Sequence, residues 1–217
     1  MRNLKSHLQT IIAKKGPISI AEYMRLCLVD SRYGYYIHKN PIGRKGDFIT
    51  APEVSQMFGE ILGIWAVLQW QAMGKPENFF LIELGPGRGT LMVDLLQAVK
   101  TQVGFVEAMK LYLVEISPIL REQQKTVLSQ YKPSWCCHLD DIPRGPSILI
   151  ANEFFDTLPI EQFQKTDTGW HERMVGLSSK KDDLFEITLS SHAVDDAFLS
   201  MLPDTSENEV AEISLAS

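Results

Sequence analysis

The sequence predicts an α/β protein built on a doubly wound, Rossmann-like parallel sheet, and three observations support this prediction. The stretch 79–90 begins with four apolar residues, continues with an acid and three glycines at alternate positions, and leads into a helix-like run. Further apolar runs, typical of buried strands, end in polar side chains at 111–115 and 147–153. Helix-like stretches separate these runs, and alternating strands and helices are typical of parallel sheets.

Composition narrows the class of protein. The chain has 217 residues, enough for one good-sized core, of which 45% are hydrophobic and 22% charged. Its net charge of −6 argues against a nucleic-acid-binding protein, which normally carries a basic field. Three cysteines, none in a Cys-x-x-Cys pair, indicate a reducing compartment and predict no metal site.

The sequence shows no signal for a membrane or for export. Its longest apolar candidate, 61–70, is shorter than the ~18 residues that a membrane span needs. The N-terminus has neither the apolar core of a secretory signal nor the Arg- and Ser-rich composition of a mitochondrial presequence. We therefore expect no cleaved leader and a cytoplasmic location.

Residues 1–75 are expected to form an N-terminal helical segment. Apolar residues at helical spacing predict a first helix over Leu4–Lys15, which a Gly-Pro pair ends. Ser19 and Glu22 fit a capping box that begins a second helix. A stronger third helix is predicted from about Ser55 to Met73.

The stretch 42–53 has neither helical nor strand periodicity. It holds two glycines, a proline, two basic residues and two acids. An ordinary surface loop could have this composition; the functional interpretation is a lid for substrate or cofactor, packed over the glycine loop. The candidate lid residues are Asp47, Phe48, Thr50, Pro52 and Glu53.

The glycine loop is the strongest candidate for a binding site. Glycines let the backbone turn sharply and let a ligand approach the main chain without meeting a Cβ atom. An acid lies two residues before the first glycine, at the carboxyl end of the predicted strand, where doubly wound sheets bind ligands. The spacing Gly-x-Gly-x-Gly differs from that of dinucleotide folds, and a turn without a ligand is the alternative. The candidate residues are Glu83, Gly85, Pro86, Gly87 and Gly89.

Four long motifs in a fixed order carry a specific resemblance. They are Gly46–Glu53 with Phe58–Glu60, Glu83–Leu91, Val114–Pro118 and Asn152–Ile160. In these residues, and as far as about Val175, the chain resembles the MidA/NDUFAF7 family, which are class I S-adenosylmethionine-dependent methyltransferase-like proteins of bacteria and mitochondria. The resemblance implies S-adenosylmethionine as cofactor, with the glycines under its methionine part and Glu83 orienting its amino end. It also implies a protein substrate, because the mitochondrial members methylate an arginine of a respiratory complex I subunit.

Two further acids are candidates for the nucleoside part of the cofactor. Glu115 ends the second predicted strand, where a carboxylate can accept hydrogen bonds from both ribose hydroxyls and repels a phosphate. This favours S-adenosylmethionine or NAD over NADP, and a solvated strand end is the alternative. A short third strand is predicted over Ser134–Leu139. In the fold that the resemblance implies, an acid after it binds the adenine amino group; Asp141 or Asp140 is that candidate, and a solvated turn is the alternative.

The fourth predicted strand, Ser147–Ala151, leads into an amide and two acids that face the cofactor crevice. Asn152 is assigned to the cofactor. By analogy with arginine methyltransferases, Glu153 is the first catalytic carboxylate, and Glu161 or Asp156 is the second. The alternative is that Asn152 and Glu153 only tie loops together.

The cofactor-binding core is thus expected over 76–160, and residues 161–217 are expected to form a β-hairpin insertion and an acidic tail. The hairpin would join 162–163 to 170–177, and 184–189 would pair with it. The predicted exposed turn at 180–183 and the weakly patterned stretch 203–217 complete this part. A complete class I fold has seven strands, whereas four are recognised here. We therefore expect the remaining core strands to be missing, with one exposed sheet edge.

These features predict a methyltransferase that acts on protein arginine. The first alternative is a non-catalytic assembly or scaffold protein that keeps the fold. The second is an NAD-dependent oxidoreductase, which is disfavoured because Gly-x-Gly-x-x-Gly is absent and none of the five histidines lies in a recognisable motif. The oligomeric state is left open.

Overall fold

The structure is a computed structural model that describes residues 3–39, 41–43, 46–180, 184–195 and 202–214. It consists of two compact units, one formed by Met1–Tyr35 with Thr157–Ser217 and the other by Tyr36–Asp156. This division differs from the predicted boundary at residue 75, because the first two helices pack with the C-terminal strands, whereas the third helix packs on the parallel sheet.

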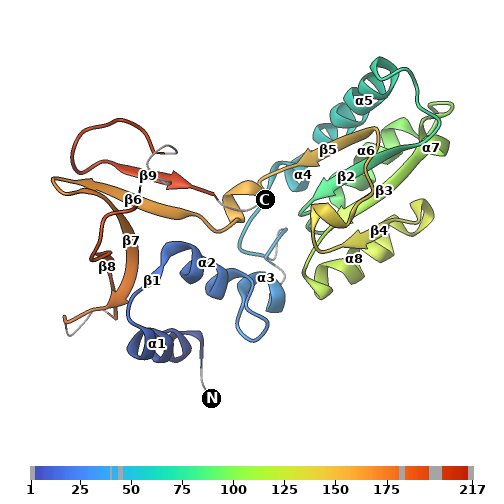
Figure 1. Ribbon diagram of the computed structural model, residues 1–217. Coiled ribbons are helices and arrows are strands. Elements are labelled where there is room, and N and C mark those ends of the chain that lie inside the picture. Colours follow the sequence, from blue (N-terminus) through green and yellow to red (C-terminus); the bar gives the residue numbers. More distant parts are fainter. Residues whose placement is uncertain (1–2, 40, 44–45, 181–183, 196–201, 215–217) are drawn as a thin grey trace. The chain divides into compact units, whose positions relative to one another are not determined.

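The unit over Tyr36–Asp156 contains the predicted parallel sheet (Figure 1). Its strands are β2 (Phe79–Leu84), β3 (Met109–Val114), β4 (Ser134–Cys136) and β5 (Ser147–Ala151). They pair in parallel in the order β4-β3-β2-β5, so the α/β class and the four core strands are confirmed. β4 is shorter than predicted. Among the described residues, the outer edge of β5 pairs with no strand.

Helices cover one face of this sheet. They are α5 (Gln56–Ala72), α6 (Thr90–Val99), α7 (Phe105–Ala108) and α8 (Pro118–Leu128). Alternate strand residues, such as Phe79 and Leu81, share one core with apolar side chains of these helices, such as Leu95. The opposite face carries a smaller cluster around Ile82 and Leu84, which among the described residues takes its members from strands and loops only.

Short helical turns connect the main elements of this unit and flank it. They are α3 (Tyr35–His38), α4 (Ala51–Val54), η1 (Ser129–Tyr131), η2 (Leu139–Asp141) and η3 (Phe155–Thr157). The predicted lid stretch therefore ends in one turn of helix, which its composition did not indicate. No helix in the described ranges is long and apolar enough to cross a bilayer.

The order of the strands brings the candidate residues to one edge of the sheet. β3 lies on one side of β2 and β5 on the other, so the connections diverge at the carboxyl end of β2. Leu84 at this end pairs with Val114 of β3 and Ala151 of β5. The residues that follow these three strands therefore meet at the switch point, where open α/β sheets bind ligands.

The other unit combines two helices with an antiparallel sheet. Helices α1 (Leu4–Lys15) and α2 (Ile20–Leu28) lie where the sequence predicts them. The predicted cap is confirmed, since the backbone N–H of Glu22 donates to Oγ of Ser19 at 3.0 Å. Leu8, Ile12 and Leu26 of these helices pack with Val175, which explains why they belong with the C-terminal strands.

The antiparallel sheet contains the predicted hairpin. Its strands are β1 (Ile18–Ser19), β6 (Glu161–Thr166), β7 (Gly169–Leu177), β8 (Phe185–Leu189) and β9 (Val210–Ile213). β6 and β7 form the hairpin, and β8 pairs with β7 as expected. β9, which pairs with β6, was not predicted because it has only four residues and lies in an acidic, weakly patterned stretch. Most of the predicted turn at 180–183 lies outside the described residues.

Candidate functional site

The loop after β2 turns on glycines that its backbone requires. Gly85, Gly87 and Gly89 have φ of +60°, +54° and +84°, in the left-handed region that side chains disfavour. A Cβ atom at Gly85 would lie 2.6 Å from a ring carbon of Phe154, and one at Gly87 would lie 2.8 Å from Cδ1 of Ile42. The sharp turn is therefore confirmed, and at the first two glycines there is no room for a side chain.

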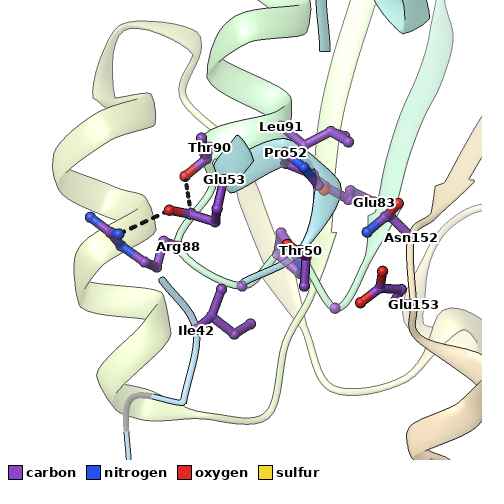
Figure 2. Close-up of a pocket in the computed structure, with 13 residues that line it drawn as sticks. Ile42, Thr50, Pro52, Glu53, Glu83, Arg88, Thr90, Leu91, Asn152 and Glu153 are labelled. Atoms are coloured by element: carbon purple, nitrogen blue, oxygen red, sulfur yellow. Dashed lines mark hydrogen bonds and ion pairs between the residues drawn. The ribbon is translucent and has the colours of Figure 1, made fainter. Parts of the chain in front are cut away.

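A hollow opens between this loop, the lid stretch and the residues after β5 (Figure 2). It is lined by Ile42, Thr50, Pro52, Glu53, Glu83, Gly85, Pro86, Gly87, Arg88, Thr90, Leu91, Asn152 and Glu153. The structure thus brings together residues that the sequence assigned separately to cofactor, lid and catalysis. Sequence reasoning missed Ile42, Arg88, Thr90 and Leu91. The last three lie within the glycine motif or just after it, and this position is the signal that could have found them.

Glu83 is the buried acid of this hollow. Only 3% of the residue is exposed, and its Oε2 has no hydrogen-bond partner among the described residues. Burial raises the pKa of Glu83 to about 8, and the nearby charge of Glu115 acts in the same direction. The side chain is therefore largely protonated at neutral pH, and an incoming cation would favour its ionised form.

Glu53 ties the lid stretch to the glycine loop. Its Oε2 lies 3.1 Å from Nη1 of Arg88, and its Oε1 accepts a hydrogen bond from Oγ1 of Thr90 at 2.6 Å (Figure 2). Ile42, from the same stretch, lies over Gly87. The stretch 42–53 therefore lies against the glycine loop, and the side chains of Arg88 and Thr90 hold Glu53 there.

We expect Glu53→Gln to loosen this lid. The change removes the charge that pairs with Arg88, a partner whose side chain is 45% exposed, so the effect is limited to about 0.5–1 kcal/mol. Backbone amides at 46–54 should then exchange with deuterium about two- to fivefold faster. Glu60→Gln is the control, because Glu60 accepts only a local hydrogen bond from Gln56 within α5. Equal exchange rates of these amides in wild type and Glu53→Gln would show that Glu53 does not hold the stretch against the glycine loop.

Glu115 lies at the switch point but is turned into the protein. It is 7% exposed; its Oε1 accepts from the backbone N–H of Ser117 at 2.8 Å and its Oε2 from Nε2 of Gln124 at 3.2 Å. Burial raises the pKa of Glu115, and these two hydrogen bonds act against that rise. The carboxylate is therefore not a solvated strand end, although it is outside the lining of the hollow.

The residues after β5 divide between the hollow and the surface. Asn152 and Glu153 line the hollow, and Glu153 has φ of +48°, which is uncommon for a residue with a side chain. Such a conformation is retained where the surroundings require it, often at functional sites. Asp156 is exposed in η3 outside the hollow. Glu161 begins β6 in the other unit.

The other predicted positions also lie outside the hollow. Gly89 is the N-cap of α6. Asp47 and Phe48 are exposed on the lid stretch. Asp141 is exposed in η2, where its Oδ2 accepts from the backbone N–H of His138, so it caps its own turn.

The lining of the hollow suits a cofactor, but its volume is smaller than that of a typical cofactor site. Glycine backbone without side chains and a buried acid with an unpartnered oxygen suit a cationic group that approaches the main chain. The enclosed volume is about 60 Å³, whereas sites for small organic ligands measure roughly 300–1,000 Å³. The hollow as it stands is therefore too small to enclose a whole nucleoside-containing cofactor.

Comparisons with known proteins agree with this geometry. A family model described as "Putative S-adenosyl-L-methionine-dependent methyltransferase" matches residues 61–217. The chain is 42% identical to "Protein arginine methyltransferase NDUFAF7, mitochondrial" of Mus musculus, over 85% of this chain and 48% of that protein. It is also 42% identical to the Homo sapiens protein of the same name, over 86% and 48%.

A solved structure supports the same assignment. A COG1565 superfamily member from Burkholderia thailandensis, bound to S-adenosyl-homocysteine, matches with a TM-score of 0.76 and 26% identity, over 97% of this chain and 56% of that chain. The parallel sheet and the glycine loop thus place the chain in the Rossmann-like fold class of this solved methyltransferase relative. The chain belongs to the S-adenosyl-L-methionine-dependent methyltransferase family whose model it matches, together with the NDUFAF7 proteins. It spans about half the length of the curated relatives it matches.

Proposed function

We propose that this protein transfers a methyl group from S-adenosylmethionine to an arginine side chain of a protein substrate. The observation that carries the proposal is the hollow beside the glycine loop, where a buried oxygen of Glu83 has no hydrogen-bond partner in the described part of the chain. The names of the relatives support arginine as acceptor and favour methyl transfer over hydride transfer. S-adenosyl-homocysteine in the Burkholderia structure supports the cofactor.

The residues of the glycine loop would hold the methionine part of the cofactor. Glu83 suits its ammonium group, because a cation next to the carboxyl favours the ionised form against the burial that raises its pKa. Gly85 and Gly87 carry no side chain of their own, so a ligand that displaces Ile42 from Gly87 could approach the main chain closely. Asn152 could form hydrogen bonds with the methionine part of the cofactor. Glu115 could accept hydrogen bonds from its ribose. The bound cofactor supplies an activated methyl group and needs no metal.

Glu153 would handle the acceptor. An arginine guanidinium is charged and delocalised, and a carboxylate that pairs with it fixes its plane and localises electron density on one nitrogen. Glu153 lines the hollow on the side of β5, opposite the lid. Asp156 and Glu161 remain candidates for the second carboxylate. Since alignment of the reacting groups and exclusion of water supply much of the acceleration, closure of the lid over the bound cofactor would belong to the same mechanism.

The proposed location follows the names of the relatives, and the proposed partner follows the family resemblance of the sequence. The animal relatives are named as mitochondrial proteins. We place the protein in the mitochondrial matrix if its source is eukaryotic, with a subunit of respiratory complex I as acceptor, and in the cytoplasm if its source is bacterial. A scaffold that binds the cofactor without transferring the methyl group is the outcome that the next experiment separates from catalysis.

Glu153→Gln should leave cofactor affinity within about twofold and lower methyl transfer about tenfold. Glutamine keeps the shape and one acceptor oxygen but loses the charge, and the difference between charged and neutral hydrogen bonds is about 1.4 kcal/mol. Affinity for S-adenosyl-homocysteine and transfer of labelled methyl groups to arginine in a cell extract are measured on one preparation.

The control for this experiment is Glu77→Gln, which changes an exposed acid that does not line the hollow. Full transfer by Glu153→Gln would remove Glu153 from the mechanism. Equal loss of affinity and transfer would make it a cofactor or structural residue instead. Binding without any transfer in wild type would support the scaffold.

A further inference from the structure

Gln124 on α8 is a fully buried polar side chain that joins three parts of the sheet edge. Its Nε2 donates to the carbonyl oxygen of Gly87 at 2.7 Å and to Oε2 of Glu115 at 3.2 Å. Its Oε1 accepts from the indole Nε1 of Trp135 at 2.8 Å. The residue is 0% exposed, and glutamine is seldom buried so completely unless its polar atoms are satisfied.

The chemistry of the partners fixes the orientation of this amide. An indole N–H can only donate, so the oxygen of Gln124 must face Trp135. The carbonyl of Gly87 and the carboxylate of Glu115 can only accept, so the NH₂ group must face them. A carboxylate in place of the amide would set acceptor against acceptor, and a hydrocarbon would remove a hydrogen bond from Gly87, Glu115 and the half-buried Trp135.

The two acceptors belong to different halves of the cofactor site. Gly87 is the central glycine of the loop assigned to the methionine part, and Glu115 is the acid assigned to the ribose. The peptide after Gly87 is trans, so drawing its carbonyl towards α8 directs the N–H of Arg88 away from α8. The same NH₂ group lies against Glu115.

We propose that Gln124 is a positioning residue for the cofactor: it holds the glycine loop and the ribose carboxylate at one spacing, so that a single ligand can use both. This proposal rests on the proposed function. Gln124 does not itself line the hollow, and it acts through Gly87 and Glu115. Trp135 anchors it from the far side.

A positioning role for Gln124 predicts a pH dependence of binding that a purely structural role would lack. The hydrogen bond from Gln124 favours the ionised form of Glu115, against the burial that raises the pKa of that carboxyl. The other charged groups that act on Glu115 are Glu83 of β2 and Arg121 of α8. Without Gln124, the pKa of Glu115 should rise further. A ligand that needs the carboxylate for its ribose should then bind well only at higher pH.

The experiment measures binding to the 217-residue chain by calorimetry. S-adenosyl-homocysteine tests both halves of the site, and adenosine, titrated from pH 5 to pH 9, tests the ribose half alone. Gln124→Met removes the hydrogen bonds at nearly constant size. Gln124→Glu keeps the shape and regains one donor only when its new carboxyl is protonated. Gln123→Met, a partly exposed neighbour on the same helix, is the matched control.

Gln124→Met should weaken S-adenosyl-homocysteine about 30-fold and move the pH profile for adenosine upward. Gln124→Glu should bind S-adenosyl-homocysteine weakly at pH 8 and regain part of this affinity near pH 5. Gln123→Met should bind it as wild type does. Wild-type affinity and an unshifted profile in folded Gln124→Met would overturn the proposal. If Gln124→Met does not fold, Trp135→Phe is used instead, because it removes the indole N–H that holds the amide oxygen of Gln124. About fivefold weaker binding of S-adenosyl-homocysteine by Trp135→Phe would support the proposal, and unchanged binding would overturn it. A wild-type chain that binds no S-adenosyl-homocysteine would instead overturn the proposed function, and with it this role.

Discussion

Glu83→Gln should stabilise the chain at pH 8 and at the same time weaken its cofactor. In the unfolded chain Glu83 titrates near its ordinary pKa of 4.5, whereas in the folded chain burial raises that pKa to about 8. A raised pKa means that the contribution of the group to stability is fully present below pH 4.5 and is lost as the pH rises through 8. Glutamine stays neutral and avoids this loss.

The stability gained by Glu83→Gln should therefore grow with pH. It should be small at pH 5 and reach roughly 2–4 kcal/mol at pH 8, because each unit of pKa shift corresponds to about 1.4 kcal/mol. Urea denaturation of both chains at pH 5 and pH 8 measures it, with Glu77→Gln as an exposed control. If the difference in unfolding free energy between wild type and Glu83→Gln is the same at both pH values, folding does not raise the pKa of Glu83.

Cofactor affinity should change in the opposite direction in the same variant. A carboxylate that pairs with the ammonium of S-adenosylmethionine contributes about 1–2 kcal/mol more than a neutral amide, which corresponds to roughly 5- to 30-fold in affinity. A more stable protein that binds less well would show that the buried acid is kept for function at the expense of stability. Unchanged affinity would remove Glu83 from the cofactor site.

Gly87→Val should abolish cofactor binding, and this is the second large effect. Position 87 has φ of +54°, which a β-branched residue disfavours strongly, and its first side-chain atom would lie 2.8 Å from Ile42. The added methyl groups would occupy the surface that the cofactor has to approach. We expect a loss of more than about 100-fold for S-adenosyl-homocysteine, which exceeds 2.7 kcal/mol.

The control for this variant distinguishes the effect of backbone strain from the loss of the cofactor-binding surface. Gly74 has φ of +85° and nothing within 4 Å of an added Cβ, so Gly74→Val imposes comparable backbone strain away from the hollow. Each variant should lose about 1–3 kcal/mol of stability. Only Gly87→Val should lose the cofactor. A folded Gly87→Val chain that binds like wild type would contradict the assignment of the glycine loop.

Periodicity and glycine positions were sufficient to predict the elements that carry the site. The strand before Glu83, the turn at Gly85 and Gly87, and the helix after it follow from neighbouring residues, because local backbone preferences decide them. The convergence of Glu83 with Asn152 followed from the rule for parallel sheets. Such features depend on short stretches of sequence.

Features decided by tertiary packing could not be predicted in this way. Nothing near Gln124 in the sequence indicates that its amide meets Gly87 and Trp135, since the three positions lie on separate elements. The pairing of β1 with β7, which draws the first two helices into the C-terminal unit, is equally distant in sequence. The latch between Glu53 and Arg88 joins two motifs that were each recognised, but their contact was not.

One measurement tests the central claim most directly. S-adenosyl-homocysteine, which carries the same ammonium group as the methyl donor, is titrated into the 217-residue chain at pH 7 in two buffers that differ in ionisation enthalpy. We predict one saturable site, with release of up to one proton because the ammonium drives ionisation of Glu83 from its raised pKa of about 8, and no such release in Glu83→Gln. Absence of binding up to ~1 mM, where the standard free energy of binding would be weaker than about −4 kcal/mol, would contradict the claim. Binding with the same proton release in Glu83→Gln would contradict it as well.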